Sequence, residues 1–348
     1  MNENFIENIS KHAYDILKKD YKISVSNRVL ILFDLDSKLS KIMKEGFSKA
    51  CEKLANSFDL VDYNTTTAED IFEDIDWNFK KDDIVVLIQS SSFRVTKFRL
   101  RNDLCSRGLK VVEFSHLKKV KEEEFQTFAN SIEYQSDHYQ RLSDELVERL
   151  GKCESITMIS ENGQEARYEG KMDFTVRNDG DYEGNNNYGS RYPIGEVLTE
   201  AIDLTCLNGE LEVYAYPNTK QETQFDKPFT IKVENGFVVS HTGDSGFNEI
   251  YEMIKTEHPE GKVYVREFGL GLNKGIPRFS RIGDPIAYER QEGLHFSLGM
   301  KHGIYQKKLW PKYGKKFFQR YHIDVYINLE EMYFDQELIY TKEKGYVL

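Results

Sequence analysis

Three short segments in the first half of the chain that are typical of strands constrain its fold most strongly. The segment 28–33 is apolar after Arg28, the segment 84–88 is apolar throughout, and a third strand is predicted at 110–114. A strand in which every residue is apolar is buried on both faces, which is typical of a parallel sheet. Segments with helical spacing of apolar residues, such as Ser37–Ser57, lie between these runs. Strands that alternate with helices predict crossover units, so we expect residues 1–145 to form an open α/β domain with a mainly parallel sheet.

The pattern changes near Gly151. Beyond it, apolar and polar residues alternate in short segments, as expected for strands with one buried face. The predicted strands are Ser155–Ser160, Glu165–Glu169, Asp173–Arg177, Glu210–Tyr216, Phe229–Val233, Lys262–Glu267, Gly293–Leu298 and His322–Ile327. One helix is predicted at Gly246–Thr256. We therefore expect residues 151–348 to form an α+β domain with a curved, mostly antiparallel sheet.

Composition excludes several classes of function. The net charge of −11 argues against general nucleic-acid binding, and no apolar stretch has the length of a membrane span. The four cysteines include no CxxC pair, so neither a thiolate zinc site nor a disulfide framework is indicated. The first residues read as a polar amphipathic helix rather than a signal peptide. We expect a cytoplasmic protein that binds neither nucleic acid nor membrane.

Nucleotide-binding motifs are absent from the first half, which contains neither GxGxxG nor a Walker A sequence. Ser90–Ser92 follows a predicted strand, where a ligand can meet the carboxyl end of a parallel sheet. The favoured interpretation is a polar turn that caps the next helix.

Two residues near the end of the chain form the first candidate for metal binding. His322 and Asp324 are two positions apart in a predicted strand, so both side chains point to the same face. One imidazole nitrogen and one carboxylate oxygen suit zinc, manganese, cobalt or ferrous iron. The alternative is a surface ion pair.

Three further residues have side chains of the same kinds. His295 lies in an apolar strand, where it is either a ligand or a hydrogen-bonded core histidine. Glu267 ends an apolar strand, and a buried carboxylate is costly unless it is paired or metal-bound. Its alternative partners are Arg266, Arg278 and Arg281. Glu196 follows Pro193 and Gly195, which predict a turn that presents its side chain.

These residues belong to four ordered motifs. They are PxGEVxT at 193–199, ExGxGxN at 267–273, HxxxG at 295–299 and HxD at 322–324. In this order they resemble the thermophilic-type metallo-aminopeptidases, the family of aminopeptidase T, aminopeptidase S and PepS. The segment 27–33 and the helix after it also resemble that family, so the resemblance extends over most of the chain.

The resemblance implies a hydrolase with two divalent ions, zinc, cobalt or manganese, that cleaves an amino-terminal residue or a related amide. Glu196 would be a bridging or shared carboxylate, and Glu267, His295, His322 and Asp324 would be the other ligands. It implies a peptide or small-molecule substrate and a homodimer. We assign substrate binding to Arg191 and Lys301.

The chain departs from the family pattern after the HxxxG motif. The aminopeptidases have a catalytic-site Tyr a few residues beyond that His, and this chain has His302 there, with Tyr305 as the nearest tyrosine downstream. Either residue can take the tyrosine's place. We therefore expect Glu196, His302 and Tyr305 to be catalytic.

Two alternatives to the hydrolase remain. The 2,5-dihydroxypyridine ring-cleaving dioxygenases resemble these aminopeptidases but hold one ferrous iron with two histidines and an aspartate. In this chain His295 or His302 would join His322 and Asp324. The presence of both Glu196 and Glu267 favours the two-metal hydrolase. The third possibility is a repurposed scaffold without catalytic activity.

The segment Lys301–Tyr321 is rich in Lys, Arg and aromatic residues and has no acidic residue. Because it joins two strands that carry proposed ligands, one interpretation is a lid that attracts an acidic substrate. The other is a solvated loop or a subunit contact.

Overall fold

The computed structural model describes residues 3–93, 100–182, 189–258, 260–299 and 321–348. The chain forms two compact units. The first contains Met1–Gln140 and Asn178–Ile194, and the second contains Arg141–Arg177 and Gly195–Leu348. The chain thus returns to the first unit once before it completes the second. The sequence had suggested one division near residue 150.

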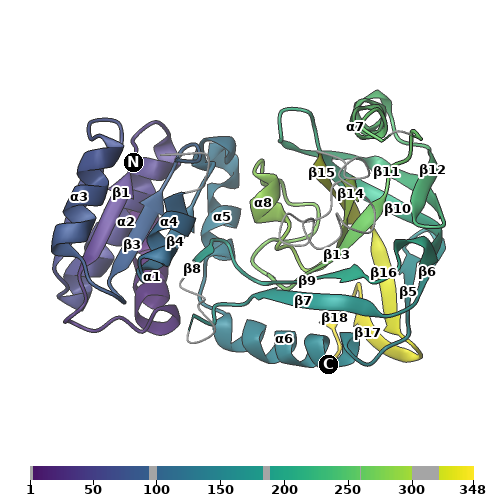
Figure 1. Cartoon of the computed structure of the whole chain (residues 1–348), viewed down its shortest axis with the longest axis horizontal. Helices are drawn as coiled ribbons and strands as arrows, with labels where there is room; N and C mark the ends of the chain where they lie inside the picture. Colours follow the sequence, from purple (N-terminus) through teal and green to yellow (C-terminus); the bar gives the residue numbers. More distant parts are fainter. Residues whose placement is uncertain (1–2, 94–99, 183–188, 259, 300–320) are drawn as a thin grey trace. The chain divides into compact units, whose positions relative to one another are not determined.

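The first unit is an α/β structure, which agrees with the fold class predicted for this half. Its parallel sheet has the strand order β2-β1-β3-β4-β8 (Figure 1). The strands are β1 (Val29–Phe33), β2 (Phe58–Asp62), β3 (Ile84–Ile88), β4 (Lys110–Phe114) and β8 (Gly189–Arg191). The helices are α1 (Glu3–Asp15), α2 (Lys38–Leu54), α3 (Ala68–Asn78), α4 (Leu100–Ser106) and α5 (Phe125–Ser131). The division between the units falls within α6 (Ser136–Leu150).

The core of the first unit explains the apolar runs. Every residue of β1 and β3 is buried, so both faces of the centre of the sheet are covered. On one face, alternate residues of β1, β3 and β4 pack against Ile71 and Ile75 of α3 and against Leu100 and Leu104 of α4. The sequence missed β2, whose residues are all at least partly exposed and include two aspartates.

The second unit contains a curled antiparallel sheet that resembles half of a barrel, as predicted in outline (Figure 1). Its strand order is β18-β17-β16-β5-β6-β10-β15-β14-β13-β9-β7, and β11 and β12 extend from β10. The first strands are β5 (Ser155–Ser160), β6 (Glu165–Glu169), β7 (Met172–Asn178), β9 (Glu196–Ala201), β10 (Leu207–Pro217), β11 (Thr223–Glu234) and β12 (Phe237–His241). They are followed by β13 (Val265–Gly271), β14 (Gly293–Gly299), β15 (His322–Ile327), β16 (Leu329–Phe334), β17 (Glu337–Thr341) and β18 (Gly345–Tyr346). Its helices after α6 are α7 (Ser245–Lys255) and the short α8 (Pro285–Tyr288).

Four neighbouring strands, in the order β15-β14-β13-β9, position the predicted ligands. Residues that pair directly across antiparallel strands point to the same face. Glu196 pairs with Gly271, Gly269 pairs with His295, and Ser297 pairs with Asp324. Because alternate residues of one strand share a face, the predicted ligands on these strands share one face of the sheet.

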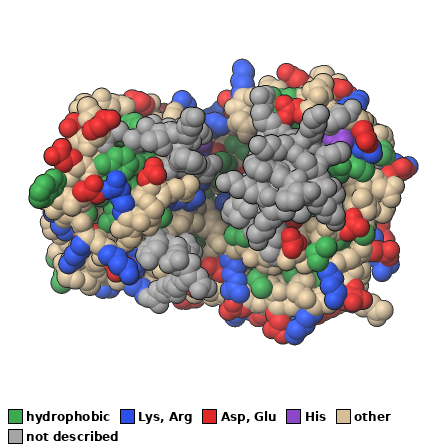
Figure 2. Space-filling model, in the orientation of Figure 1, with side chains coloured by type: hydrophobic (Ala, Val, Ile, Leu, Met, Phe, Trp, Pro, Cys, Tyr) green, Lys and Arg blue, Asp and Glu red, His purple; other side chains and the backbone are tan. Residues whose placement is uncertain are grey.

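The described surface is polar and mixed in charge. Figure 2 shows Lys and Arg side chains interspersed with Asp and Glu over the coloured part of one face. Every described helix is too short or too polar to span a lipid bilayer.

Candidate metal centre

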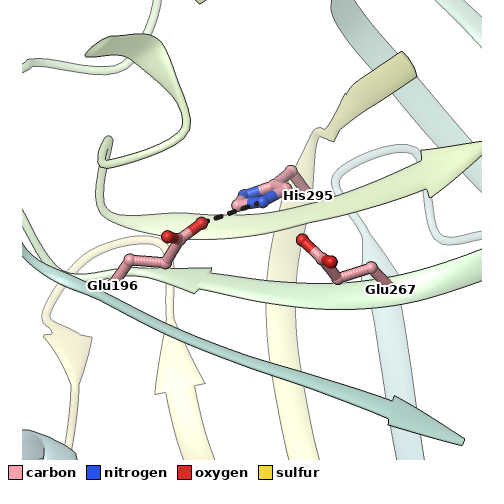
Figure 3. Close-up of side chains that lie close together, drawn as sticks. All are labelled: Glu196, Glu267 and His295. Atoms are coloured by element: carbon pink, nitrogen blue, oxygen red, sulfur yellow. Dashed lines mark ion pairs between the residues drawn. The ribbon is translucent and has the colours of Figure 1, made fainter. Parts of the chain in front are cut away.

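The predicted ligands come together in two groups that share one residue. The first group contains Glu196, Glu267 and His295, and the second contains Glu267, His322 and Asp324. Within each group, one ligand atom from each residue lies within 4.8 Å of the others. Figure 3 shows the three side chains of the first group converging from three strands. Glu267 is the residue common to both groups, and the family resemblance implies a bridging role for Glu196.

The spacing inside each group suits a metal ion better than a hydrogen bond. His295 Nε2 is 3.4 Å from Glu196 Oε1, and His322 Nε2 is 3.3 Å from Asp324 Oδ1. A good N–H···O hydrogen bond is about 2.7–3.2 Å long. Two ligand atoms that are each about 2.0–2.1 Å from a tetrahedral ion are separated by about 3.3 Å. Both distances therefore match the edge of a tetrahedral coordination shell.

Several buried atoms of the cluster have unused hydrogen-bonding capacity. Glu267 Oε2, His295 Nε2 and Asp324 Oδ1 make no hydrogen bond within the described part of the chain. These three residues are 4%, 2% and 5% exposed. An unpaired buried polar atom is costly, and buried polar atoms are nearly always satisfied in folded proteins. Three such atoms that face one another fit a bound cation.

Glycines of the second motif make room for the histidine. A Cβ atom on Gly269 would lie 1.9 Å from His295 Nε2, so any larger residue at this position would displace the imidazole. Glu267 was expected to end its strand, but β13 continues to Gly271. At Gly269 and Gly271, the space that a side chain would need is occupied by His295 and by the backbone of Gln291. Glycine at these two positions therefore allows the strand to continue beside them.

The electrostatics of the cluster favour an added positive charge. Burial raises the pKa of Glu267 to about 7, despite the opposing effect of His322. Burial alone would lower the pKa of His322, but the carboxylates of Asp324 and Glu267 raise it well above its usual value. Burial opposes ionisation of Asp324, yet His322 holds its pKa below the usual range. In the absence of metal, the cluster thus retains protons close to where a cation would bind.

Two charged residues at the edge of the cluster were missed by the sequence reasoning. The guanidinium group of Arg290 contacts Glu196 Oε2, and its Nη1 lies 3.0 Å from Oε2 of Glu289. Burial, together with the nearby carboxylate of Asp324, raises the pKa of Glu289 well above its usual range. The only available signal was a Glu-Arg pair shortly before the apolar strand of His295.

The remaining predicted site residues are placed differently. Lys301, His302 and Tyr305 lie outside the described residues, as does most of the basic segment. Arg191 lies on β8 of the first unit and is 5% exposed. Arg266 and Arg278, considered as partners of Glu267, donate hydrogen bonds to the carbonyl oxygens of Gly299 and Leu329.

Comparison with known proteins identifies the fold. No family model and no curated protein matches this sequence. The structure is similar to 2,5-dihydroxypyridine dioxygenase from Pseudomonas putida KT2440, with a TM-score of 0.62 and 14% identity over 98% of this chain and 97% of that one. It is also similar to wild-type AmpT from Thermus thermophilus, with a TM-score of 0.57 and 15% identity over 94% of each chain. At these identities the similarity establishes a shared two-domain fold.

Proposed function

We propose that this protein is a metal-dependent hydrolase of the aminopeptidase type, with two divalent ions bound by Glu196, Glu267, His295, His322 and Asp324. It would cleave an amino-terminal residue, or a related amide, from a peptide or small molecule. The observation that carries the proposal is the pair of ligand groups that share Glu267. Two adjacent positions with a common carboxylate are what a two-metal hydrolase requires.

Each side chain has a defined task in this proposal. Glu196 and His295 would hold one position, His322 and Asp324 the other, and Glu267 would hold both. Two divalent ions at such a site lower the pKa of a water molecule and polarise a peptide carbonyl. Four of the five side chains are buried in the sheet, which orients them and limits access of bulk water, whereas His322 is 24% exposed. The catalytic roles of His302 and Tyr305 and the substrate-binding role of Lys301 stay as expected from the sequence.

The aminopeptidase proposal is tested with a panel of fluorogenic aminoacyl substrates after loading with cobalt, zinc or manganese. We expect metal-dependent release of the fluorophore, and His322→Ala should lower kcat/KM by at least about 100-fold, because removal of a ligand costs more than removal of an outer-shell partner. Glu212→Gln is a matched control, because Glu212 lies in the same sheet and hydrogen-bonds to Asn328. Activity that survives His322→Ala would refute the site assignment.

A second candidate is a ring-cleaving dioxygenase with one ferrous iron. The contact of Arg290 with Glu196 favours this candidate. The guanidinium group of Arg290 already supplies one positive charge at the first position, so only the other position would need a metal ion. The described residues place His295 and His322 in different ligand groups, which argues against a facial triad that contains both of these histidines. The triad that contains His302 lies partly outside the described residues. Metal analysis after anaerobic purification separates the candidates. One iron per chain, with oxygen uptake on hydroxypyridine rings, would support the dioxygenase, and about two divalent ions per chain would support the hydrolase.

A further inference from the structure

An ion pair is built into the edge of the candidate metal centre. The side chain of Arg290 is 8% exposed, and its Nη1 contacts the carboxyl groups of both Glu196 and Glu289. An arginine keeps its charge at every physiological pH, so this position carries a permanent cation. Burial of that charge is tolerated because both carboxylates compensate it.

The backbone holds Arg290 firmly in place. The segment follows α8, and the amide of Glu289 donates to the carbonyl of Pro285 at 2.9 Å. The amide of Asn273 donates to the carbonyl of Arg290 at 2.8 Å. A Cβ atom on Gly271 would lie 1.8 Å from the carbonyl oxygen of Gln291. The second glycine of the ExGxGxN motif thus allows the backbone that carries Arg290 to approach β13.

The pair makes the two metal positions electrostatically unequal. The cation of Arg290 contacts Glu196, a proposed ligand of the first position. Asp324, a proposed ligand of the second position, pairs instead with His322, another proposed ligand of the same position. A permanent positive charge close to a cation site weakens binding of the cation there.

We propose that Arg290 competes with metal for Glu196, so that the two positions fill in order. The second position, with His322 and Asp324, binds an ion tightly and fills first. The first position, with Glu196 and His295, binds its ion more weakly and fills later. This inference rests on the two-position centre proposed above. It makes Arg290 a positioning residue that sets the number of ions bound at a given metal concentration.

The opposite role predicts the opposite result. If Arg290 only oriented Glu196 as an outer-shell partner, its removal would weaken metal binding. If it competes with metal, loss of its charge frees Glu196 and strengthens binding at that position. The sign of the change in affinity therefore separates the two roles.

The experiment is a titration of the whole metal-free chain with Mn²⁺. Calorimetry measures the affinities, and electron paramagnetic resonance detects neighbouring ions. Two neighbouring Mn²⁺ ions give a spin-coupled signal that a single ion does not give. In the wild type we expect the second ion to bind at least about tenfold more weakly than the first. Arg290→Gln should tighten the second site by at least about tenfold, and the coupled signal should appear at lower Mn²⁺. Arg290→Lys keeps the charge and should resemble the wild type.

Three results would overturn the inference. They are equal affinities of the two wild-type sites, a weaker or unchanged second site in Arg290→Gln, and a second site that tightens equally in Arg290→Lys. Circular dichroism checks that the variants are folded, and if Arg290→Gln does not fold, the wild-type affinities decide. Failure of the wild type to bind any Mn²⁺, Zn²⁺ or Co²⁺ would instead refute the proposed metal centre, and the inference with it.

Discussion

Buried carboxylates are treated differently in the two units of this protein. In the first unit, Asp20 is 5% exposed and accepts hydrogen bonds from the hydroxyl groups of Ser136, at 2.5 Å, and Tyr192, at 2.7 Å. In the second unit, Glu267 is equally buried, and its Oε2 receives no hydrogen bond from the described residues. The first carboxylate is satisfied by its own chain, and the second faces other unsatisfied ligand atoms.

This difference separates a structural acid from a ligand. Burial of a polar group is costly unless the fold supplies a partner. The first unit supplies one hydroxyl group to each carboxylate oxygen of Asp20. The second unit places His295 and Asp324 beside Glu267, but neither of these residues donates a hydrogen bond to Glu267 Oε2. The pattern of satisfied and unsatisfied atoms thus indicates where an external cation belongs.

The largest expected effect comes from removal of the shared carboxylate. Glu267→Gln should weaken metal binding at both positions, each by at least about 100-fold, because an amide is a neutral and much poorer ligand. The thermal stabilisation of the wild type by added Zn²⁺ should disappear in this variant. Differential scanning calorimetry with and without metal measures this. Glu212→Gln should keep the full stabilisation, and an unchanged shift in Glu267→Gln would contradict the shared role.

The second prediction concerns the satisfied carboxylate. Burial raises the pKa of Asp20 from 3.8 to about 6, and the hydroxyl groups of Ser136 and Tyr192 oppose this only in part. A raised pKa in the folded state means that the stabilisation is complete below about pH 4 and is lost as the pH rises through about 6. The free energy of unfolding should therefore fall by about 3 kcal/mol over this interval.

Asp20→Asn should remove this pH dependence, because the amide does not titrate. The measurement is hydrogen exchange along a urea titration at several pH values, followed in peptides of β1 and β3 so that only the first unit is monitored. Asp59→Asn, a partly exposed carboxylate that pairs with Arg28, is the control and should behave as the wild type. If the free energy of unfolding of the wild type does not change between pH 4 and 6, burial does not raise the pKa of Asp20.

The smallest predicted effect is a steric one. Gly269→Ala would place a Cβ atom 1.9 Å from His295 Nε2, so the imidazole must move. We expect about a tenfold loss of affinity at the position of Glu196 and His295, with the position of His322 and Asp324 retained. Mn²⁺ calorimetry measures both. Gly151→Ala is the matched control, because its new Cβ would have no neighbour closer than 3.3 Å. Equal losses at both positions would indicate a general disturbance of the sheet.

Much of the fold was accessible from local sequence patterns. Continuous apolar runs predicted β1 and β3 because the centre of a parallel sheet is buried on both faces, and β4 was predicted as the next strand in the alternation of strands and helices. Two other strands of that sheet were not predicted. The residues of β2 are partly exposed and include aspartates, and β8 has only three residues. Neither carries a periodic signal long enough to be recognised.

The candidate site was predicted where a single strand defines the geometry. His322 and Asp324 had to share a face because side chains alternate along a strand. Glu289 and Arg290 were not predicted, because their position depends on a backbone approach permitted by Gly271 and not on any local periodicity. That Glu267 belongs to both ligand groups also depends on strand order, which a linear motif does not contain.

The central claim is that the second unit carries a metal centre on the face formed by β9, β13, β14 and β15. It is tested most directly by a crystal structure of the protein loaded with Mn²⁺ or Zn²⁺, with anomalous diffraction data collected at the absorption edge of the metal. We expect an anomalous peak about 2.0–2.2 Å from a carboxylate oxygen of Glu267 and from Nε2 of His322. At higher metal concentration it predicts a second peak beside His295. Crystals grown with millimolar metal that show no anomalous density at these side chains would contradict it.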